Sequence, residues 1–245
     1  MARIVESIAS DRRHGAHYLT LRAAGAFRLL AAKSGAAVFE RQLLELAQSL
    51  AAAQPRMAPL LNLTNAVLLA AEKSAARPNP AEAVNEAACA FAGGMEKHAE
   101  EAAVRFSSCL KKRSVILTLS SSDTVKRALM HAWRRKRLER VILTESRPLL
   151  EGRQMAVELG RAGVPVTLIV DAAMLEAMRA ADVALAGADA VTVQGVVNKT
   201  GTALLALTAR ACRKPIYAVC SSEKLLPAGL KLAGEPLRDP GEILP

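Results

Sequence analysis

The second half of the chain alternates short apolar runs with helical segments, and this alternation restricts the fold more than any other feature. The runs carry no charge and are rich in β-branched residues, as expected of strands buried on both faces. They comprise residues 115–119, 141–144, 166–170, 183–186 and 216–219, and the helical segments comprise residues 124–137, 152–161, 173–180 and 202–213. This alternation predicts a parallel sheet covered by helices on both faces, in a Rossmann-like α/β domain.

The first part of the chain predicts helices only. Apolar residues recur at helical spacing from Ile4 to Ala23, and residues 36–53 are rich in Ala and Leu with charges on the other face. Residues 76–80 contain two prolines and predict a turn before a helix from about Ala81, and Gly93-Gly94 predicts a second weak point. We therefore expect a helical N-terminal domain over residues 1–104 and a Rossmann-like ligand-binding domain over residues 105–245.

Composition narrows the class of partner. The 245 residues are 51% hydrophobic but only 3% aromatic, which argues against the base-stacking surfaces of single-strand nucleic-acid binders, so a nucleic-acid partner is not expected. The net charge of +10 favours an anionic partner such as a phosphorylated metabolite, a nucleotide, RNA or an acidic protein face. The four cysteines form no C-x-x-C pair and predict reduced core thiols. No run approaches the length of a membrane span, so we expect a cytoplasmic protein and no membrane partner.

Polar residues follow the ends of the predicted strands. In open parallel sheets, ligands bind outside the carboxyl ends of the strands, near a switch in strand order. This rule selects residues 120–122, residues 145–147, Asp171, Asp189 and the turn around Lys199. The predicted site is therefore one edge of the sheet.

The stretch from residue 187 to 202, GADAVTVQGVVNKTGT, has the composition of a phosphate-binding turn. Asp189 follows a predicted strand, and Lys199 with Gly201 and Thr202 precedes a predicted helix. Free N–H groups and the dipole at a helix start favour an anion. The stretch lacks the glycine spacing of a Walker A loop, and an ordinary capped strand-turn-helix connection stays open as the alternative.

The combination of NKTGT (residues 198–202) with a preceding GAD (residues 187–189) resembles the alpha, beta and delta regulatory subunits of initiation factor 2B. Residues 116–118 (ILT), 144–148 (TESRP) and 171–173 (DAA) carry the same resemblance. The superfamily includes methylthioribose-1-phosphate isomerase and ribose-1,5-bisphosphate isomerase. The resemblance implies a dimer that binds a phosphorylated sugar or nucleotide, with other protein assembly partners open and no cofactor or metal.

The resemblance also implies a set of site residues. The implied ligand-binding residues are Arg13, Gln54, Ser121, Ser122, Glu145, Arg147, Arg153, Asn198, Lys199, Gly201 and Thr202, and the implied catalytic pair is Asp189 with Ser120. Ser120 stands where the isomerases have a cysteine, Leu119 where they have a histidine, and Gln54 where they have an arginine. An extra residue, His14, separates Arg13 from the following glycine. These departures remove half of the proton-transfer apparatus of the isomerases.

Plainer roles are open for several of these residues. Ser120 to Asp123 suit a helix N-cap, and Arg147 suits an ion pair with Glu145 or Asp171. The basic run from His131 to Arg140 suits a solvated helix end, with an RNA-facing helix as the alternative. His14 and His17 are three residues apart, but no further metal ligand is evident, so we expect no metal site.

The sequence therefore predicts an initiation factor 2B-like protein that binds a phosphorylated sugar or nucleotide without efficient catalysis. The first alternative is an aldose-ketose isomerase acting on a ribose phosphate, so the sequence leaves the question of enzyme activity open. The second alternative, from another class, is an RNA- or protein-binding module.

Overall fold

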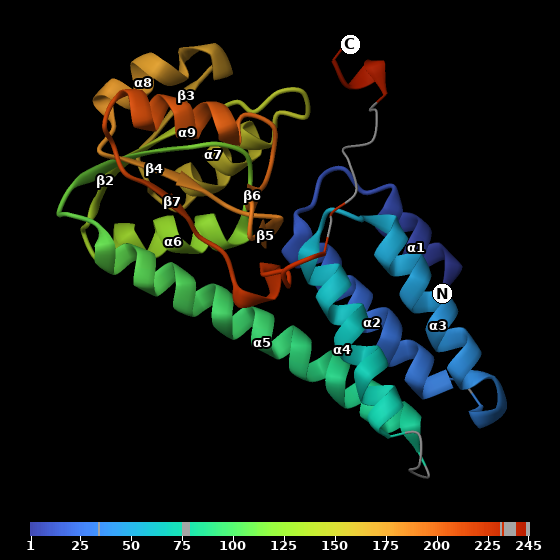
Figure 1. Ribbon diagram of the computed structural model, residues 1–245. Helices are drawn as coiled ribbons and strands as arrows, with labels where there is room; N and C mark the ends of the chain where they lie inside the picture. Colours follow the sequence, from blue (N-terminus) through green and yellow to red (C-terminus); the bar gives the residue numbers. More distant parts are fainter. Residues whose placement is uncertain (34, 75–78, 231, 233–238, 244–245) are drawn as a thin grey trace. The chain divides into compact units, whose positions relative to one another are not determined.

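The computed structural model describes residues 1–33, 35–74, 79–230, 232 and 239–243 (Figure 1). The chain forms two compact units. The first contains residues 1–97, 189–195 and 222–235, and the second contains residues 98–188, 196–221 and 236–245. The predicted boundary after residue 104 falls inside one uninterrupted helix, α5 (Pro80–Cys109), and stays a prediction.

The first unit is built from helices, as predicted. They are α1 (Ala2–Ala9), α2 (Ala16–Lys33), α3 (Ala36–Ala53), α4 (Ala58–Lys73) and the first part of α5. Phe27, Leu43, Leu50, Leu60 and Leu63 are among the residues of its core. The helical spacing of apolar residues thus buries one face of each helix.

The expected weak point at Gly93-Gly94 is wrong, because α5 runs through both glycines without a break. A glycine inside a helix costs only about 1 kcal/mol. Ala88 and Met95 on either side are fully buried, and their burial offsets this cost. The break predicted at residues 76–80 lies mostly outside the described residues, and α5 begins at Pro80.

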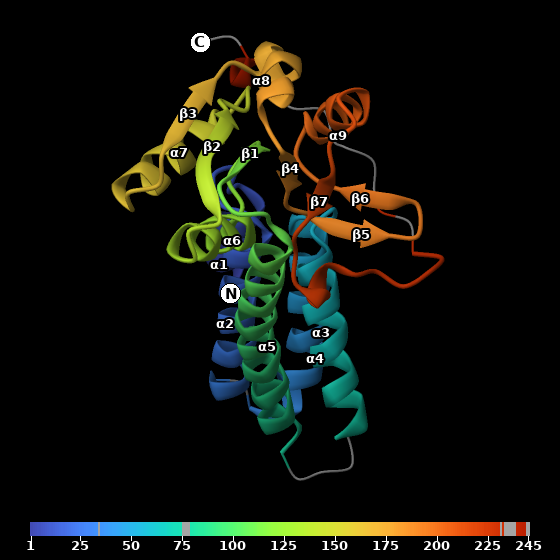
Figure 2. The same ribbon diagram turned by 90° about the vertical axis from the view of Figure 1, so that its left-hand side faces the viewer.

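The second unit contains a five-stranded parallel sheet with the order β3-β2-β1-β4-β7 (Figure 2). The strands are β1 (Ser114–Thr118), β2 (Leu138–Thr144), β3 (Val166–Ile169), β4 (Val183–Ala186) and β7 (Ile216–Ala218). The helices are α6 (Asp123–Arg134), α7 (Glu151–Arg161), α8 (Met174–Ala180) and α9 (Thr202–Ala211), with a 3-10 turn η1 (Asp171–Ala173) before α8. The predicted α/β class is therefore confirmed.

Helices cover both faces of the sheet, as predicted. The end of α5, α6 and α7 contribute to one core, and α8 and α9 contribute to the other. Every residue of β1 and β4 is buried, whereas every residue of the edge strand β7 is exposed. The other edge strand, β3, also has no buried residue, so the prediction of buried strands holds at the centre of the sheet and fails at both edges.

The chain changes direction across the sheet at β1. After β1 it adds β2 and then β3 on one side, and β4 and β7 then extend the sheet on the other side of β1. The loops after β1 and β4 therefore flank the switch in strand order, which is where open parallel sheets bind ligands. These loops begin at Leu119 and Gly187.

Three local features differ from the sequence-based expectations. Residues 190–197 form a two-stranded sheet, β5 (Ala190–Thr192) and β6 (Gly195–Val197), where only a turn was predicted. Helix α6 ends at Arg134, three residues early, because the chain turns at Lys136 with a φ of 54° to enter β2. None of the four cysteines, all of which the structure describes, forms a disulfide, but Cys89 and Cys109 are exposed, so the prediction of core thiols is wrong for these two.

Within the described residues, no helix is both long enough and apolar enough to cross a bilayer.

Candidate functional site

The loop after β1, which contains Ser120, Ser121 and Ser122, contacts the loop after β4 at Gly187. Ser122 is the N-cap of α6, and its Oγ accepts a hydrogen bond from the N–H of Val125 at 3.5 Å. A Cβ at Gly187 would lie 2.8 Å from Ser122 Oγ, so only glycine permits this approach. The predicted capping role of Ser122 is therefore present, while Ser120 and Ser121 are half-buried beside it.

The turn after β2 is fixed by Asp171. Both carboxylate oxygens accept backbone hydrogen bonds, Oδ1 from Ser146 at 3.0 Å and Oδ2 from Arg147 at 2.8 Å. Ser146 in turn accepts a hydrogen bond at its Oγ from the N–H of Ser120 at 2.7 Å. The ends of β1 and β2 and the η1 turn after β3 are thus joined by hydrogen bonds, and the backbone at this edge is held in place.

The cations next to β2 have different environments. Arg153 pairs with Glu145, with 2.5 Å between Nη2 and Oε2. The carboxylate of Asp171 accepts hydrogen bonds from backbone N–H groups instead. The alternative in which Arg147 forms an ion pair with Glu145 or Asp171 is therefore not seen. The side chain of Arg147 is exposed and makes no ion pair with any described residue. Arg147 is therefore available to an anion.

Helix α7 starts in close contact with β2. A Cβ at Gly152 would lie 1.9 Å from the carbonyl oxygen of Thr144, far inside van der Waals contact. Only glycine allows the first turn of α7 to approach the strand this closely. The preceding residue, Glu151, is consequently held at the carboxyl edge of the sheet.

The turn before α9 is closed by its own side chains. Asn198 donates from Nδ2 to Thr202 Oγ1 at 2.9 Å, and Thr202 Oγ1 donates to the carbonyl of Lys199 at 2.7 Å. Gly201 has a φ of 100°, which favours glycine. Asn198, Gly201 and Thr202 therefore shape the turn that presents Lys199.

Lys199 pairs with Glu151, a residue that the sequence analysis did not select. The distance from Nζ to Oε1 is 2.6 Å, and the side chains are 20% and 14% exposed. The other carboxylate oxygen, Oε2, is buried and has no hydrogen-bond partner among the described residues. This pair brings together the N-terminal ends of α9 and α7. An ion pair with a neighbouring acid gives Lys199 a structural role.

Three predicted site residues, Asp189, Gln54 and Arg13, belong to the first unit. The carbonyl of Asp189 accepts the N–H of Ala58 at 3.0 Å, and the residue is half-buried. Gln54 donates from Nε2 to the carbonyls of Ile8, Ala9 and Asp11 at 3.0 to 3.4 Å, which satisfies the end of α1.

Arg13 is exposed and lies in a turn organised by Asp11. Burial acts to raise the pKa of Asp11, but hydrogen bonds from the N–H groups of His14 and Arg13 lower it below its ordinary value. His14 Nδ1 lies 2.8 Å from Asp11, whereas His17 Nε2 lies 2.8 Å from Glu96. The two histidines therefore have separate partners. The part of the chain that the structure describes holds no group of three or more potential metal ligands.

The chain is similar in sequence to proteins named as translation initiation factors and as isomerases. The profile described as "Initiation factor 2 subunit family" matches residues 12–244. A Pyrococcus horikoshii protein described as eIF-2B subunit 2-like is 33% identical over 91% of this chain and 79% of its own length. The ribose 1,5-bisphosphate isomerase of Thermococcus kodakarensis is 31% identical over 99% of this chain and 78% of its own length.

Solved structures agree with these sequence matches. The translation initiation factor eIF-2B of Pyrococcus horikoshii matches with a TM-score of 0.86 at 32% identity, over 99% of this chain and 82% of that one. The 5-methylthioribose 1-phosphate isomerase of the same organism matches with a TM-score of 0.81 at 23% identity, over 99% and 73% of the two chains, which shows a shared fold.

Proposed function

Because the chain belongs to the initiation factor 2 subunit family, we propose that it binds a phosphorylated sugar or nucleotide at the carboxyl edge of its parallel sheet, without efficient catalysis. The observation that carries this proposal is the pair of Lys199 and Glu151 at the N-terminal ends of α9 and α7. Helix starts have free N–H groups and a positive dipole end, and a lysine adds a full charge. The carboxylate of Glu151 occupies the place that suits a ligand phosphate.

The remaining groups at this edge suit the rest of such a ligand. Arg147 offers an exposed fork of N–H donors for a second phosphate or a carboxylate. The hydroxyl groups of Ser120 and Ser121 and the carboxylate of Glu145 are of the types that bind sugar hydroxyls. Two phosphate-binding cations on one sheet edge favour a bisphosphate or a nucleotide over a neutral sugar.

The absence of efficient catalysis follows from Ser120. Interconversion of an aldose and a ketose requires a group that removes a proton and one that returns it, both with pKa values near the working pH. A serine hydroxyl performs neither step without an activating base, whereas the cysteine of the related isomerases ionises much more readily. Asp189 alone supplies one of the two groups.

A second candidate function is isomerisation of a ribose phosphate, with Asp189 as acid and base and Lys199 on the phosphate. The relative named ribose 1,5-bisphosphate isomerase, which aligns over 99% of this chain, favours it. Turnover of ribose 1,5-bisphosphate distinguishes this candidate from a binding protein.

A thermal-shift series tests the proposed function. The series compares ribose 1,5-bisphosphate, methylthioribose 1-phosphate and AMP with ribose and with inorganic phosphate. A ligand at 100 times its dissociation constant stabilises a protein by about 2.7 kcal/mol, which raises the melting temperature by about 5 °C or more for a chain of this size. If no phosphorylated compound raises the melting temperature more than ribose does, the proposal is wrong.

A further inference from the structure

The opposite edge of the sheet is strongly basic. All five strands run parallel, so the segments that lead into them meet at one edge, the amino edge. These segments are residues 111–113 before β1, 134–140 at the start of β2, 161–165 before β3, 179–182 before β4 and 210–215 before β7. We call them together the basic edge.

The basic edge accounts for the charge of the whole chain. Its five segments contain thirteen Lys and Arg residues and only two acids, Glu139 and Asp182. The rest of the chain carries 20 Lys and Arg residues and 21 Asp and Glu residues, so it is nearly neutral. The net charge of +10 is therefore a local property of this edge rather than a general feature of the surface.

The two acids do little to neutralise these cations. Glu139 pairs with Arg113, with 3.1 Å between Oε2 and Nε, and both side chains are exposed, so the pair is weak. Asp182 accepts a hydrogen bond from the N–H of Val115. Arg135 and Arg137 bind the end of α5 through Ser107, Ser108 and the carbonyl of Leu110.

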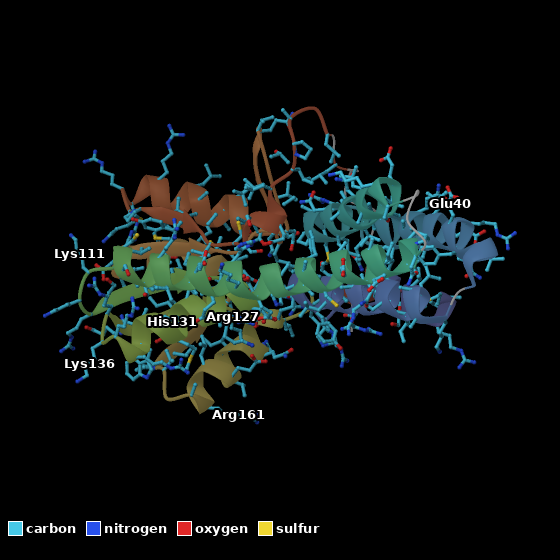
Figure 3. All side chains as sticks on the ribbon, turned by 90° about the horizontal axis from the view of Figure 1, so that it is seen from below. Glu40, Lys111, Arg127, His131, Lys136 and Arg161 are labelled. Atoms are coloured by element: carbon cyan, nitrogen blue, oxygen red, sulfur yellow. The ribbon has the colours of Figure 1, made fainter. Side chains whose placement is uncertain are left out.

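Several exposed cations of the basic edge are free to contact a partner. Lys112, Lys136 and Arg161 are exposed, and their side chains form no ion pair or hydrogen bond with a described residue. Figure 3 shows Lys111 beyond the end of α5, Lys136 beyond the end of α6 and Arg161 at the end of α7. Strands lie about 4.8 Å apart, so five strands spread these charges over about 19 Å.

We propose that the basic edge binds the phosphate backbone of double-stranded nucleic acid without sequence specificity. A duplex presents one negative charge for about every 1.7 Å of its axis, and neutralising several phosphates releases counterions. The exposed cations Lys112, Lys136 and Arg161 carry the charge that complements such a backbone. This proposal does not depend on the proposed ligand site, which lies at the other ends of the strands.

The composition of the edge favours a duplex over a single strand. Single-strand binders stack bases on aromatic side chains. Trp133, which lies in α6 next to the segment 134–140, packs against the core, and the five segments contain no aromatic residue. The low aromatic content therefore argues against base stacking, and it leaves contact with a duplex backbone open.

The test is fluorescence anisotropy with labelled 20-base-pair RNA and DNA duplexes over a series of salt concentrations. The full chain is compared with the triple variant Lys112→Ala, Lys136→Ala, Arg161→Ala. The control variant, Arg3→Ala, Arg28→Ala, Lys33→Ala, removes three exposed cations from the first unit. We expect the first variant to bind at least about tenfold more weakly than the wild type, and the control to bind like the wild type. The slope of the logarithm of the binding constant against the logarithm of the salt concentration should be smaller by about 2 to 3 in the first variant. Equal binding of RNA and DNA indicates backbone contact alone, and preference for RNA indicates contact with its 2′-hydroxyl groups.

Several results would overturn the proposal. One is a dissociation constant weaker than about 10⁻⁴ M for both duplexes at physiological salt, which is below ordinary non-specific binding. Another is an equal loss of affinity in the two triple variants. Tighter binding of single-stranded RNA of the same length would indicate a stacking surface. Tighter binding of phosphatidylserine vesicles, lost in the first triple variant, would indicate a membrane surface instead.

Discussion

Lys199 and Glu151 are 48 residues apart in the sequence, and their side chains meet at 2.6 Å between Nζ and Oε1. The pair is only slightly exposed, and the second carboxylate oxygen has no partner among the described residues. An anionic ligand at Lys199 therefore has to displace a carboxylate of the protein. This competition allows Glu151 to be tested separately from Lys199.

Glu151→Gln is expected to strengthen binding of ribose 1,5-bisphosphate several-fold, because it removes a like charge and frees Lys199. It is also expected to lower the free energy of unfolding by about 1 to 3 kcal/mol, since a mostly buried ion pair is lost. Isothermal titration calorimetry and urea denaturation measure the two effects. The control is Glu158→Gln on the same helix, which breaks the pair with Lys126 and leaves affinity unchanged. Weaker binding in Glu151→Gln would show that Glu151 contacts the ligand directly.

Gly152→Ala is expected to destabilise the protein by about 1 to 3 kcal/mol or more, because the added Cβ collides with the carbonyl oxygen of Thr144. Gly160→Ala on the same helix has free space and should be neutral or stabilising by up to about 1 kcal/mol. Denaturant unfolding of both variants gives the comparison. Equal stabilities of the two variants would mean that α7 does not lie this close to β2.

Wild-type protein is expected to turn over ribose 1,5-bisphosphate and methylthioribose 1-phosphate far more slowly than about 10 per second, the rate of an ordinary enzyme. Ser120→Cys should increase the rate without changing KM, because a thiol transfers protons near neutral pH. Ser49→Cys on α3, which lies outside the proposed site, is the control and should leave the rate unchanged. Turnover near 10 per second by the wild type would establish the isomerase function instead.

The protein is expected to be a dimer through the side of the sheet that ends at β7. This strand is exposed along its whole length, and Leu207 on α9 is 62% exposed. Exposed strand edges with apolar neighbours favour association. Leu207→Asp should halve the mass measured by light scattering, whereas Leu168→Asp on the other edge strand, β3, should leave it unchanged. A wild-type mass of one chain at every concentration would contradict the dimer.

The sheet could be predicted from the sequence because its strands leave a strong signal. The runs VILTL and VILT are apolar, β-branched and bounded by polar turns, so the strands β1 and β2 were located to within three residues. The hairpin of β5 and β6 left no such signal, because each strand has three residues and Gly195 reads as a turn. The prediction of a weak point at Gly93-Gly94 is wrong because burial of neighbouring residues outweighs the low helix propensity of glycine.

The candidate site could be predicted only in part. The rule for strand ends selected Ser122, Glu145 and Lys199, since it depends on strand positions that the sequence reveals. The rule did not predict the ion pairs of Lys199 with Glu151 and of Arg153 with Glu145, because ion-pair partners depend on how the helices pack on the sheet. Thr202, Asn198 and Gln54 were predicted to bind ligand, but in the structure their hydrogen bonds stabilise local turns and a helix end. Their role toward a ligand stays a prediction.

The most direct test of the ligand-binding proposal is calorimetric titration of ribose 1,5-bisphosphate into wild type, Lys199→Ala and Lys126→Ala. Lys126 also pairs with an acid on α7, but the proposed site does not include it, so it is the matched control. A charge-assisted hydrogen bond contributes about 1.5 to 3 kcal/mol, so Lys199→Ala is predicted to bind about ten- to a hundredfold more weakly, while Lys126→Ala binds like the wild type. Unchanged affinity in Lys199→Ala, or no binding by the wild type, would contradict the proposal.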